Sequence, residues 1–228
     1  MEQRDNATDI RLGERVIKAR FAVTDASDVA GGPVELAFSA ELVEGAACQL
    51  IAAGDRMTNR PAGFSFAATF AGHVLSDPYA DLPDMGGPEG ILELQTDRPV
   101  HQRLVLNEFV RLEDVRALLA PGATGLLAIE CARHLSLVAA GEDAPFDSAA
   151  VTVPLALQLR RDDNALDALV RRLLAQVLDG PRDQRERPLS LLLSLRADMA
   201  VDRWRTLVSH PDPLVAQRAR QSLGASGP

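Results

Sequence analysis

The sequence predicts a mainly β chain that ends in helices: an antiparallel β-sandwich over residues 1–160 and a subdomain of about four helices over residues 161–228. Two observations predict this division. In the first part, short segments alternate apolar and polar residues, and turns rich in glycine and proline separate them. After Asp162 the apolar residues instead recur every three or four positions. This change of period marks the change from strands to helices.

The first strands are expected over residues 16–25, 34–42, 47–55 and 64–75. The clearest follows the turn Gly31-Gly32-Pro33, because its apolar residues occupy every second position. Such strict alternation gives one buried and one wet face, which is typical of an antiparallel sheet. The strand after residue 63 carries three of the seven phenylalanines on one face, and we expect them in the centre of the core: Phe64, Phe66 and Phe70.

The remaining strands surround the stretch from Arg103 to Leu137. An irregular loop over residues 76–90 holds three prolines and three glycines, and a hairpin-like pair follows it over 90–110. A turn of helix is expected before Pro121-Gly122, and two strands follow over 125–139 and 149–161. Pro154 lacks the N–H that a ladder needs, so the last strand is expected at an edge or with a bulge. Asn107 is expected at a turn or corner, and these residues in the core: Leu104, Leu106, Phe109, Leu127, Ile129 and Cys131.

The helical part begins with a regular amphipathic pattern. Apolar residues from Leu166 to Leu178 keep the 3.6-residue period, with Asp163 or Asn164 as the expected cap and Gly180-Pro181 as the stop. Three further helices are expected in the segments that cover residues 188–199, 200–210 and 211–224. The first of them carries leucines on almost every side, so we expect it to lie buried between neighbours.

Several patterns in the first part resemble those of bacterial immunoglobulin-like sandwiches. They are the opening strand GGPVELAFSAEL, the loop end GGPEG and the closing LVLNEF with its later Pro-Gly turn and LAIEC strand. The resemblance covers about residues 16–160 and implies a binding or spacing role without catalytic residues. Two departures stand out: Leu126 or Leu127 replaces the aromatic residue that often follows the turn, and the expected sandwich holds no core tryptophan.

The last helix pair resembles a single HEAT-type unit over about residues 199–224. The pattern of its second helix is matched by Pro211, Asp212, Pro213, Val215, Ala219, Leu223 and Gly224. Ala216 stands where the family usually has an arginine. Since such solenoids need about three repeats for stability, we expect the helical tail to pack on the sandwich or on another chain.

The charge distribution favours a protein partner. The chain carries a net charge of −8, but residues 1–159 hold 12 basic and 23 acidic side chains, net −11, while residues 160–228 hold 12 and 9, net +3. An acidic sandwich repels nucleic acid and anionic membranes and attracts a cationic protein. The alternative is that the acidity only keeps the chain in solution.

No motif in the sequence indicates catalysis or a cofactor. The four histidines are scattered, and neither cysteine has an activating neighbour pattern. Oxygen ligands in the 76–90 loop make Ca²⁺ an alternative, yet their spacing is not that of an EF-hand. The expectation is therefore no cofactor and no metal. Cys48 and Cys131 are both expected to point inward, which leaves a bridge between them open.

Two surfaces are expected to bind a partner. One is the acidic loop, with Asp77, Tyr79, Asp81 and Asp84. The other is the polar face of the helices, with Arg171, Arg172, Arg203 and Arg205. These arginines could instead grip nucleic acid, but acidic residues lie between them, so a solvated surface or a protein contact is the preferred interpretation.

Together these features predict a non-enzymatic protein-binding module, of the immunity or inhibitor type or an adaptor, that engages a cationic partner and can form a homo- or hetero-oligomer. The alternatives are a regulatory or substrate-binding subunit of an enzyme complex, and a hydrolase with an unrecognised site. The chain shows no apolar signal-peptide core and no membrane span, so a soluble cytoplasmic protein is expected. A removed signal peptide would make it periplasmic or secreted.

Overall fold

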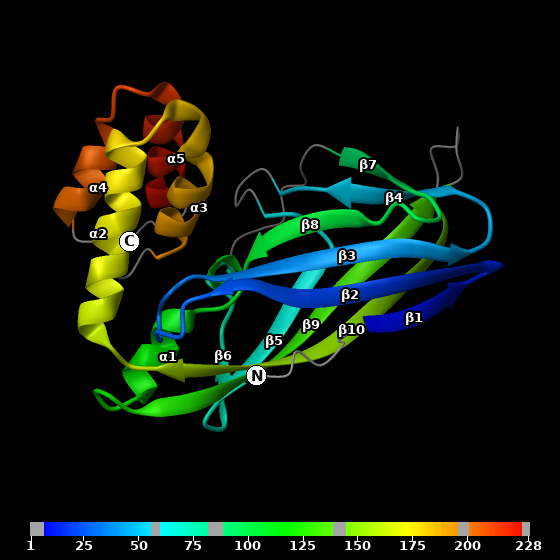
Figure 1. Ribbon diagram of the computed structural model, residues 1–228, viewed down its shortest axis with the longest axis horizontal. Coiled ribbons are helices and arrows are strands. Elements are labelled where there is room, and N and C mark those ends of the chain that lie inside the picture. Colours follow the sequence, from blue (N-terminus) through cyan, green and yellow to red (C-terminus); the bar gives the residue numbers. More distant parts are fainter. Residues whose placement is uncertain (1–6, 56–59, 82–88, 139–144, 196–200, 225–228) are drawn as a thin grey trace.

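The computed structural model describes residues 7–55, 60–81, 89–138, 145–195 and 201–224. Two antiparallel sheets face each other, and four helices gather at one end of them (Figure 1). The predicted mixture of antiparallel strands and helices is confirmed. None of the helices in the described part of the chain is long and apolar enough to cross a membrane.

The first sheet, sheet A, has the strand order β1-β2-β3-β8. Its pairs are all antiparallel, with Phe21 of β2 opposite Phe38 of β3. β3 alternates along its length, so its apolar side chains point to the second sheet and its polar ones outward. The strands are β1 (Ala7–Leu12), β2 (Arg15–Ala26), β3 (Val34–Glu44) and β8 (Val100–Val105).

The second sheet, sheet B, is built around the long strand β9. One edge of β9 pairs with β10 along its full length, and the other edge pairs first with β5 and then with β4. Its strands are β4 (Cys48–Ala53), β5 (Phe64–Phe70), β6 (His73–Leu75), β7 (Glu89–Leu94), β9 (Thr124–Val138) and β10 (Pro145–Arg160).

A buried arginine bridges the point where β4 and β5 part along β9. The guanidinium of Arg133 donates to the carbonyls of Ala62 (2.8 Å) and Ile51 (3.1 Å) and lies 4.5 Å from the ring centroid of Phe64. Burial lowers the pKa of Arg133 to about 10. The two strands would otherwise leave carbonyls without donors there, and Arg133 supplies both.

The core between the sheets is aromatic at its centre, as predicted. The ring centroids of Phe21 and Phe38 lie 5.1 Å apart, and Phe38 meets Phe64 at 5.5 Å. The core residues expected in the stretch around β8 and β9 are all buried. Cys48 and Cys131 are also buried, and both are free thiols, so the structure has no bridge between them.

The strand predictions needed four corrections. The predicted hairpin-like pair over 90–110 is not a pair, because β7 pairs with β4 in sheet B and β8 with β3 in sheet A. β1 was not expected, because half of its sequence ATDIRL is polar and its burial is partial. The predicted single strand over 64–75 is two strands, since Ala71 (φ 50°) and Gly72 (φ 81°) form a turn. The predicted strand over 103–110 ends at Val105, where the 3₁₀ turn η1 (Leu106–Glu108) begins. Pro154 does lie on an edge strand, because β10 pairs only with β9.

Asn107 holds a loop of sheet A, in agreement with the corner predicted for it. It is 6% exposed, and its Oδ1 accepts from the N–H of Val34 (3.0 Å) while its Nδ2 donates to the carbonyl of Gly32 (3.1 Å). These two bonds fix the chain directly before β3. The loop that forms one wall of the site described below is therefore anchored by the residue that follows the end of the neighbouring strand β8.

The helical part begins at the end of β10. Asp162, rather than the predicted Asp163 or Asn164, caps the first helix, because its Oδ1 accepts from the N–H of Ala165 (2.9 Å). The second helix begins at Glu186, so Pro188 lies in its first turn, where a missing N–H costs nothing. The helices are α1 (Leu112–Leu118), α2 (Asp163–Asp179), η2 (Arg182–Gln184), α3 (Glu186–Ser194), α4 (Val201–Val208) and α5 (Pro213–Gly224).

The helical part packs on the sandwich. Val105 of β8 belongs to the apolar cluster of the helices, together with Leu173 of α2 and Leu192 of α3. At the start of α2, Arg116 of α1 donates to Asp163 (2.7 Å), and Arg161 donates to the carbonyl of Leu119 (2.8 Å). These contacts place α2 and α3 beside the ends of β2, β3 and β10, and the space between them forms the candidate site.

Candidate functional site

A groove of about 960 Å³ runs between the end of sheet A and the helices α2 and α3. One wall belongs to the sandwich and comes from the end of β2, the loop before β3 and the end of β10. The other wall belongs to α2, the turn η2 and the start of α3. We call this space the inter-domain groove. Its volume falls in the range of sites that hold a small ligand or a short peptide segment.

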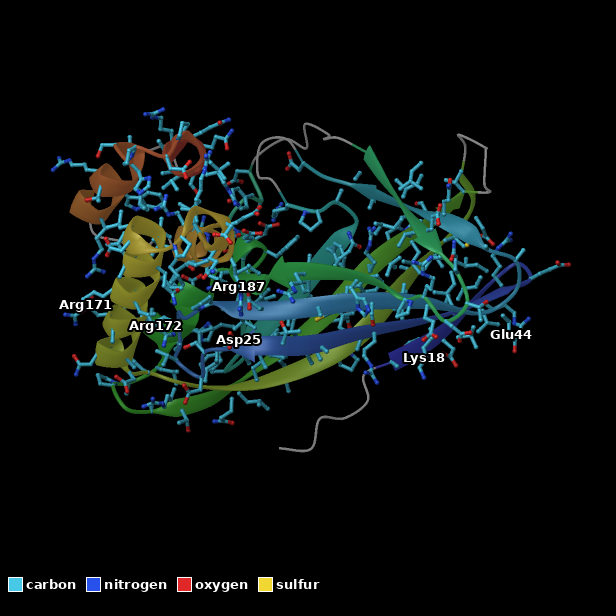
Figure 2. All side chains as sticks on the ribbon, turned by 45° about the horizontal axis from the view of Figure 1, so that its top comes forward. Lys18, Asp25, Glu44, Arg171, Arg172 and Arg187 are labelled. Carbon is cyan, nitrogen blue, oxygen red and sulfur yellow. The ribbon has the colours of Figure 1, made fainter. Side chains whose placement is uncertain are left out.

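The sandwich wall carries acidic side chains that converge on one arginine. The register of β2 and β3, which contains a bulge there, sets Asp25 opposite Glu35. Arg187 of α3 donates its Nε–H to both carboxylate oxygens of Glu35 (3.0 and 3.2 Å) and its Nη2 to Asp25 (3.0 Å). Figure 2 shows Arg187 and Asp25 facing each other between α3 and β2. Arg187 therefore closes one end of the groove by joining its two walls.

The charges of this cluster stabilise one another. Glu35 is only 9% exposed, while Asp25 remains open to solvent on the rim. The carboxylates of Glu35 first and then Asp25 raise the pKa of Arg187 above its ordinary value. The arginine charge is thus fully compensated inside the groove, and the exposed oxygens of Asp25 are free to receive further donors.

A second ion-pair cluster closes the other end of the sandwich wall. Arg160 at the end of β10 donates to Asp28 (3.0 Å) and to Asp162 (2.7 Å), the residue that caps α2. Asp28 raises the pKa of Arg160, and the N–H of Ala165 lowers the pKa of Asp162. Asp28 itself stays largely exposed. Asp25 and Asp28 therefore present two exposed aspartates on the sandwich side of the groove.

The helical wall is mainly apolar. Leu169 and Leu173 of α2 and Leu191 of α3 line it, together with Pro181 and Pro188. Leu169 is only partly buried, so it offers apolar surface that the helices do not cover themselves. Arg172 and Gln176 stand on the rim of this wall. The groove therefore opposes an apolar helical surface to an acidic strand surface.

The predicted acidic loop is used mostly inside the molecule. Both carboxylate oxygens of Asp77 accept hydrogen bonds from Nη1 of Arg60, at 2.8 and 2.9 Å. The Arg60 guanidinium lies 4.8 Å from the ring centroid of Tyr79. Tyr79 is 4% exposed. Asp81 is exposed, and Asp84 lies outside the described residues. Asp77 and Tyr79 thus hold Arg60, and they do not join the groove.

The predicted arginines fall in three places. Arg171 and Arg203 both pair with Asp167, at 2.6 and 2.7 Å, and the pair with Arg203 links α4 to α2. Arg203 above all lowers the pKa of Asp167. Arg205 lies exposed on α4. Only Arg172 lines the groove, on the face of α2 turned to the sandwich (Figure 2).

A buried carboxyl lies behind the groove, where η1 meets the helices. Burial raises the pKa of Glu108 to about 7, while Arg218, Arg60 and a hydrogen bond from Ser190 act in the opposite direction. Ser190 belongs to α3 and Arg218 to α5, so this carboxyl contacts the helical part from the sandwich. It forms part of the interface that positions the groove.

Among the residues that the structure describes, no three His, Cys, Asp or Glu side chains stand close enough to hold a metal ion. Glu35 pairs with Arg187 across the groove, and Arg160 pairs with Asp28 and with Asp162, the cap of α2. Sequence reasoning missed Asp25, Glu35 and Arg187, because each looks like an ordinary surface charge until the helices are placed on the sandwich.

A scan against models of protein families and a search of curated proteins found no match to this chain. The geometry of the inter-domain groove is therefore the basis for assigning a function.

Proposed function

We propose that the chain is a non-enzymatic protein-binding module that receives an extended segment of a partner protein in the inter-domain groove. The observation that carries this proposal is the pairing of an apolar helical wall with an acidic strand wall across about 960 Å³. Such a groove suits a peptide better than a compact metabolite, because its polar and apolar groups are spread along two opposite walls.

The two walls define the chemistry of the segment. Aliphatic side chains of the partner would contact the partly buried Leu169 and remove its exposed surface from water, beside the largely buried Leu173 and Leu191. A lysine or arginine between them would donate to Asp25 or Asp28, whose carboxylates remain largely exposed. The occupant is thus a segment that combines aliphatic residues with a basic one.

The charge of the sandwich supports a cationic partner as a whole. Residues 1–159 hold 12 basic and 23 acidic side chains, which gives this part of the chain a net charge of −11. Complementary charge accelerates encounter and selects partners more than it adds affinity. An immunity or inhibitor protein and an adaptor both fit this description, and the same groove would serve a regulatory subunit of an enzyme complex.

The architecture supports the two resemblances found in the sequence. The neighbour orders β2-β3-β8 and β4-β9-β10 correspond to the A-B-E and C-F-G orders of immunoglobulin-type sandwiches. The helices pack as the pairs α2 with α3 and α4 with α5, the unit from which HEAT-type solenoids are stacked. Both architectures commonly present binding surfaces, so we assign them here as an immunoglobulin-like sandwich with a HEAT-like tail.

A displayed library of random peptides, selected on the full chain, tests the proposal. We expect enrichment of peptides that hold a lysine or arginine beside leucine, isoleucine or valine. The double variant D25N/D28N should bind the most enriched peptide about tenfold more weakly, as measured by fluorescence polarisation. A hydrogen bond to a charged group contributes about 1.5–3 kcal/mol to binding, and less where the group is exposed, as these two carboxylates are.

The matched control is D9N, which neutralises an exposed aspartate on β1, away from the groove. D9N should leave the affinity unchanged. A selection that enriches no peptide, or an enriched peptide that binds D25N/D28N as tightly as the unmodified chain, would contradict the proposed function.

A further inference from the structure

The outer face of sheet B carries few charges where β5, β6, β9 and β10 form it, and the exposed Glu93 and Arg160 lie on β7 and at the end of β10. The register places its outward side chains in rows across β5, β9 and β10, such as Thr69, Ala128 and Ala156. In the described part of β5, β6, β9 and β10, the outward positions 65–69, 74, 126–134 and 150–158 hold two ionisable residues, Glu130 and His134. We call this surface the sheet B face.

The opposite sheet shows what a solvated face of this protein looks like. The outward side chains of sheet A include Lys18, Arg20, Glu41 and Arg103, and Lys18 points to solvent from β2 (Figure 2). A quarter of the whole chain is charged. Low charge at the centre of a surface is typical of protein interfaces. The sheet B face therefore has the composition of a covered surface, although it is exposed in a single copy.

Apolar side chains stand out from this face without a partner. Val74 of β6 is 80% exposed and Leu126 of β9 is 57% exposed. Between them lie Thr69 and Ala128, which are small enough to let another sheet approach closely. Association through the edge is disfavoured, since Pro154 sits on the edge strand β10 and offers no N–H. The face itself is the surface left for contact.

The size of the face suits a weak complex. Three strands at about 4.8 Å spacing and nine residues at about 3.3 Å give a patch of about 14 by 30 Å, or about 400 Å² before side chains are counted. The combined area of two such patches is smaller than the standard interface of about 1,600 Å². We therefore expect reversible association at micromolar concentrations.

The two ionisable residues of the sheet B face indicate what covers it. Glu130 and His134 point outward from the same strand, two positions before and two positions after Ala132. A two-fold axis above Ala132 reverses the strand direction, so Glu130 of one copy comes to face His134 of the other, twice. A histidine N–H can donate to each carboxylate, and Ala132 at the axis leaves room for the approach. The face is thus complementary to itself.

We propose that the sheet B face is the interface of a symmetric dimer, in which a second copy of this chain packs face to face with Glu130 of each copy against His134 of the other. The inter-domain groove lies outside this face, so the dimer would carry two grooves. The proposal is independent of what the groove binds.

Sedimentation equilibrium of the full chain from about 1 to 300 µM tests the dimer, because weak interfaces of this size dissociate in that range. The unmodified chain should pass from monomer to dimer. A132R, which puts two arginines at the axis, should be monomeric throughout. V43R, an exposed position on the outer face of sheet A, is the control and should dimerise like the unmodified chain.

A charge swap tests the orientation. H134E sets two carboxylates against each other and should weaken the dimer at least tenfold, and E130H/H134E should restore it because the pairing is reciprocal. If the unmodified chain stays monomeric at every concentration, the proposal is overturned. If A132R also lowers the melting temperature of that monomer, other residues of the same chain cover the sheet B face. A dimer that A132R leaves intact overturns it as well.

Discussion

Arg187 of α3 binds Glu35 of β3 across 152 positions of sequence. This contact joins the helical part to the sandwich and sets the width of the inter-domain groove. Neither residue lies in a motif, and each looks like a surface charge in the sequence. The pair therefore shows how the candidate site arises: it is produced by the docking of two parts, and its stability can be measured separately from its function.

Removing the arginine should loosen this docking. R187A leaves Glu35, which is 9% exposed, without its charged partner, so we expect the free energy of unfolding to fall by about 1–3 kcal/mol. The control R171A removes an exposed i,i+4 pair with Asp167 and should cost about 0.5 kcal/mol or less. Urea denaturation measures both, and equal losses would contradict the account.

Asn107 should be needed for the loop that forms the sandwich wall. N107A leaves the N–H of Val34 and the carbonyl of Gly32 buried without partners, at an expected cost of about 2–4 kcal/mol. Hydrogen exchange should then speed up at Val34 in particular. N164A, at an exposed position in the first turn of α2, is the control and should change neither quantity appreciably.

Gly63 should be irreplaceable because of Arg133. Its φ is +77°, and a Cβ there would lie 1.9 Å from Arg133 Nη1, whereas a Cβ at Gly72 (φ +81°) would meet nothing within 4 Å. G72A should therefore cost about 1 kcal/mol for backbone strain alone. G63A should cost at least about 2 kcal/mol more, because the buried guanidinium must leave its two carbonyls. Similar melting temperatures for the two variants would contradict this assignment.

Glu108 should make the stability depend on pH. Its folded pKa, about 7, lies above the ordinary value of 4.5, so the folded state binds the proton more tightly than the unfolded state. The stabilising contribution of Glu108 is therefore full below about pH 4.5 and is lost as the pH rises to about 7, by about 3 kcal/mol in total. E108Q resembles the protonated form and should raise the melting temperature at pH 8 but hardly at pH 5.

The control for this prediction is E14Q, at an exposed position in the turn between β1 and β2. E14Q should shift the melting temperature by less than a degree or so at either pH, as surface substitutions usually do. An E108Q variant whose effect is the same at pH 5 and pH 8 would show that burial does not hold the proton on Glu108.

The sequence predicted what local patterns determine. Alternation located β3, β9 and β10 and their core side chains, and the 3.6-residue period located α2, since burial of one face leaves a periodic trace. The weakly buried β1 left no such trace. Tyr79 was expected at a partner surface, but it is buried beside Arg60, which approaches from outside the loop.

The candidate site could not be predicted from the sequence for a different reason. Its walls come from residues 25–35, 160 and 165–191, and no periodicity relates them. Of the arginines singled out beforehand, Arg172 alone lines the groove. Where two parts of a chain meet depends on the sum of many contacts between distant residues, and neither part carries a pattern that records the other.

The most direct test of the central claim is to fill the inter-domain groove. Ala168 of α2 lines it, while Ala175 of the same helix is exposed outside it. The affinities of A168W and A175W for the most enriched peptide should be compared by fluorescence polarisation, with melting temperatures as a check on folding. We predict that A168W binds at least about tenfold more weakly, a loss of about 1.4 kcal/mol, and that A175W binds like the unmodified chain. Equal affinities of A168W and the unmodified chain would contradict the assignment of the groove as the binding site.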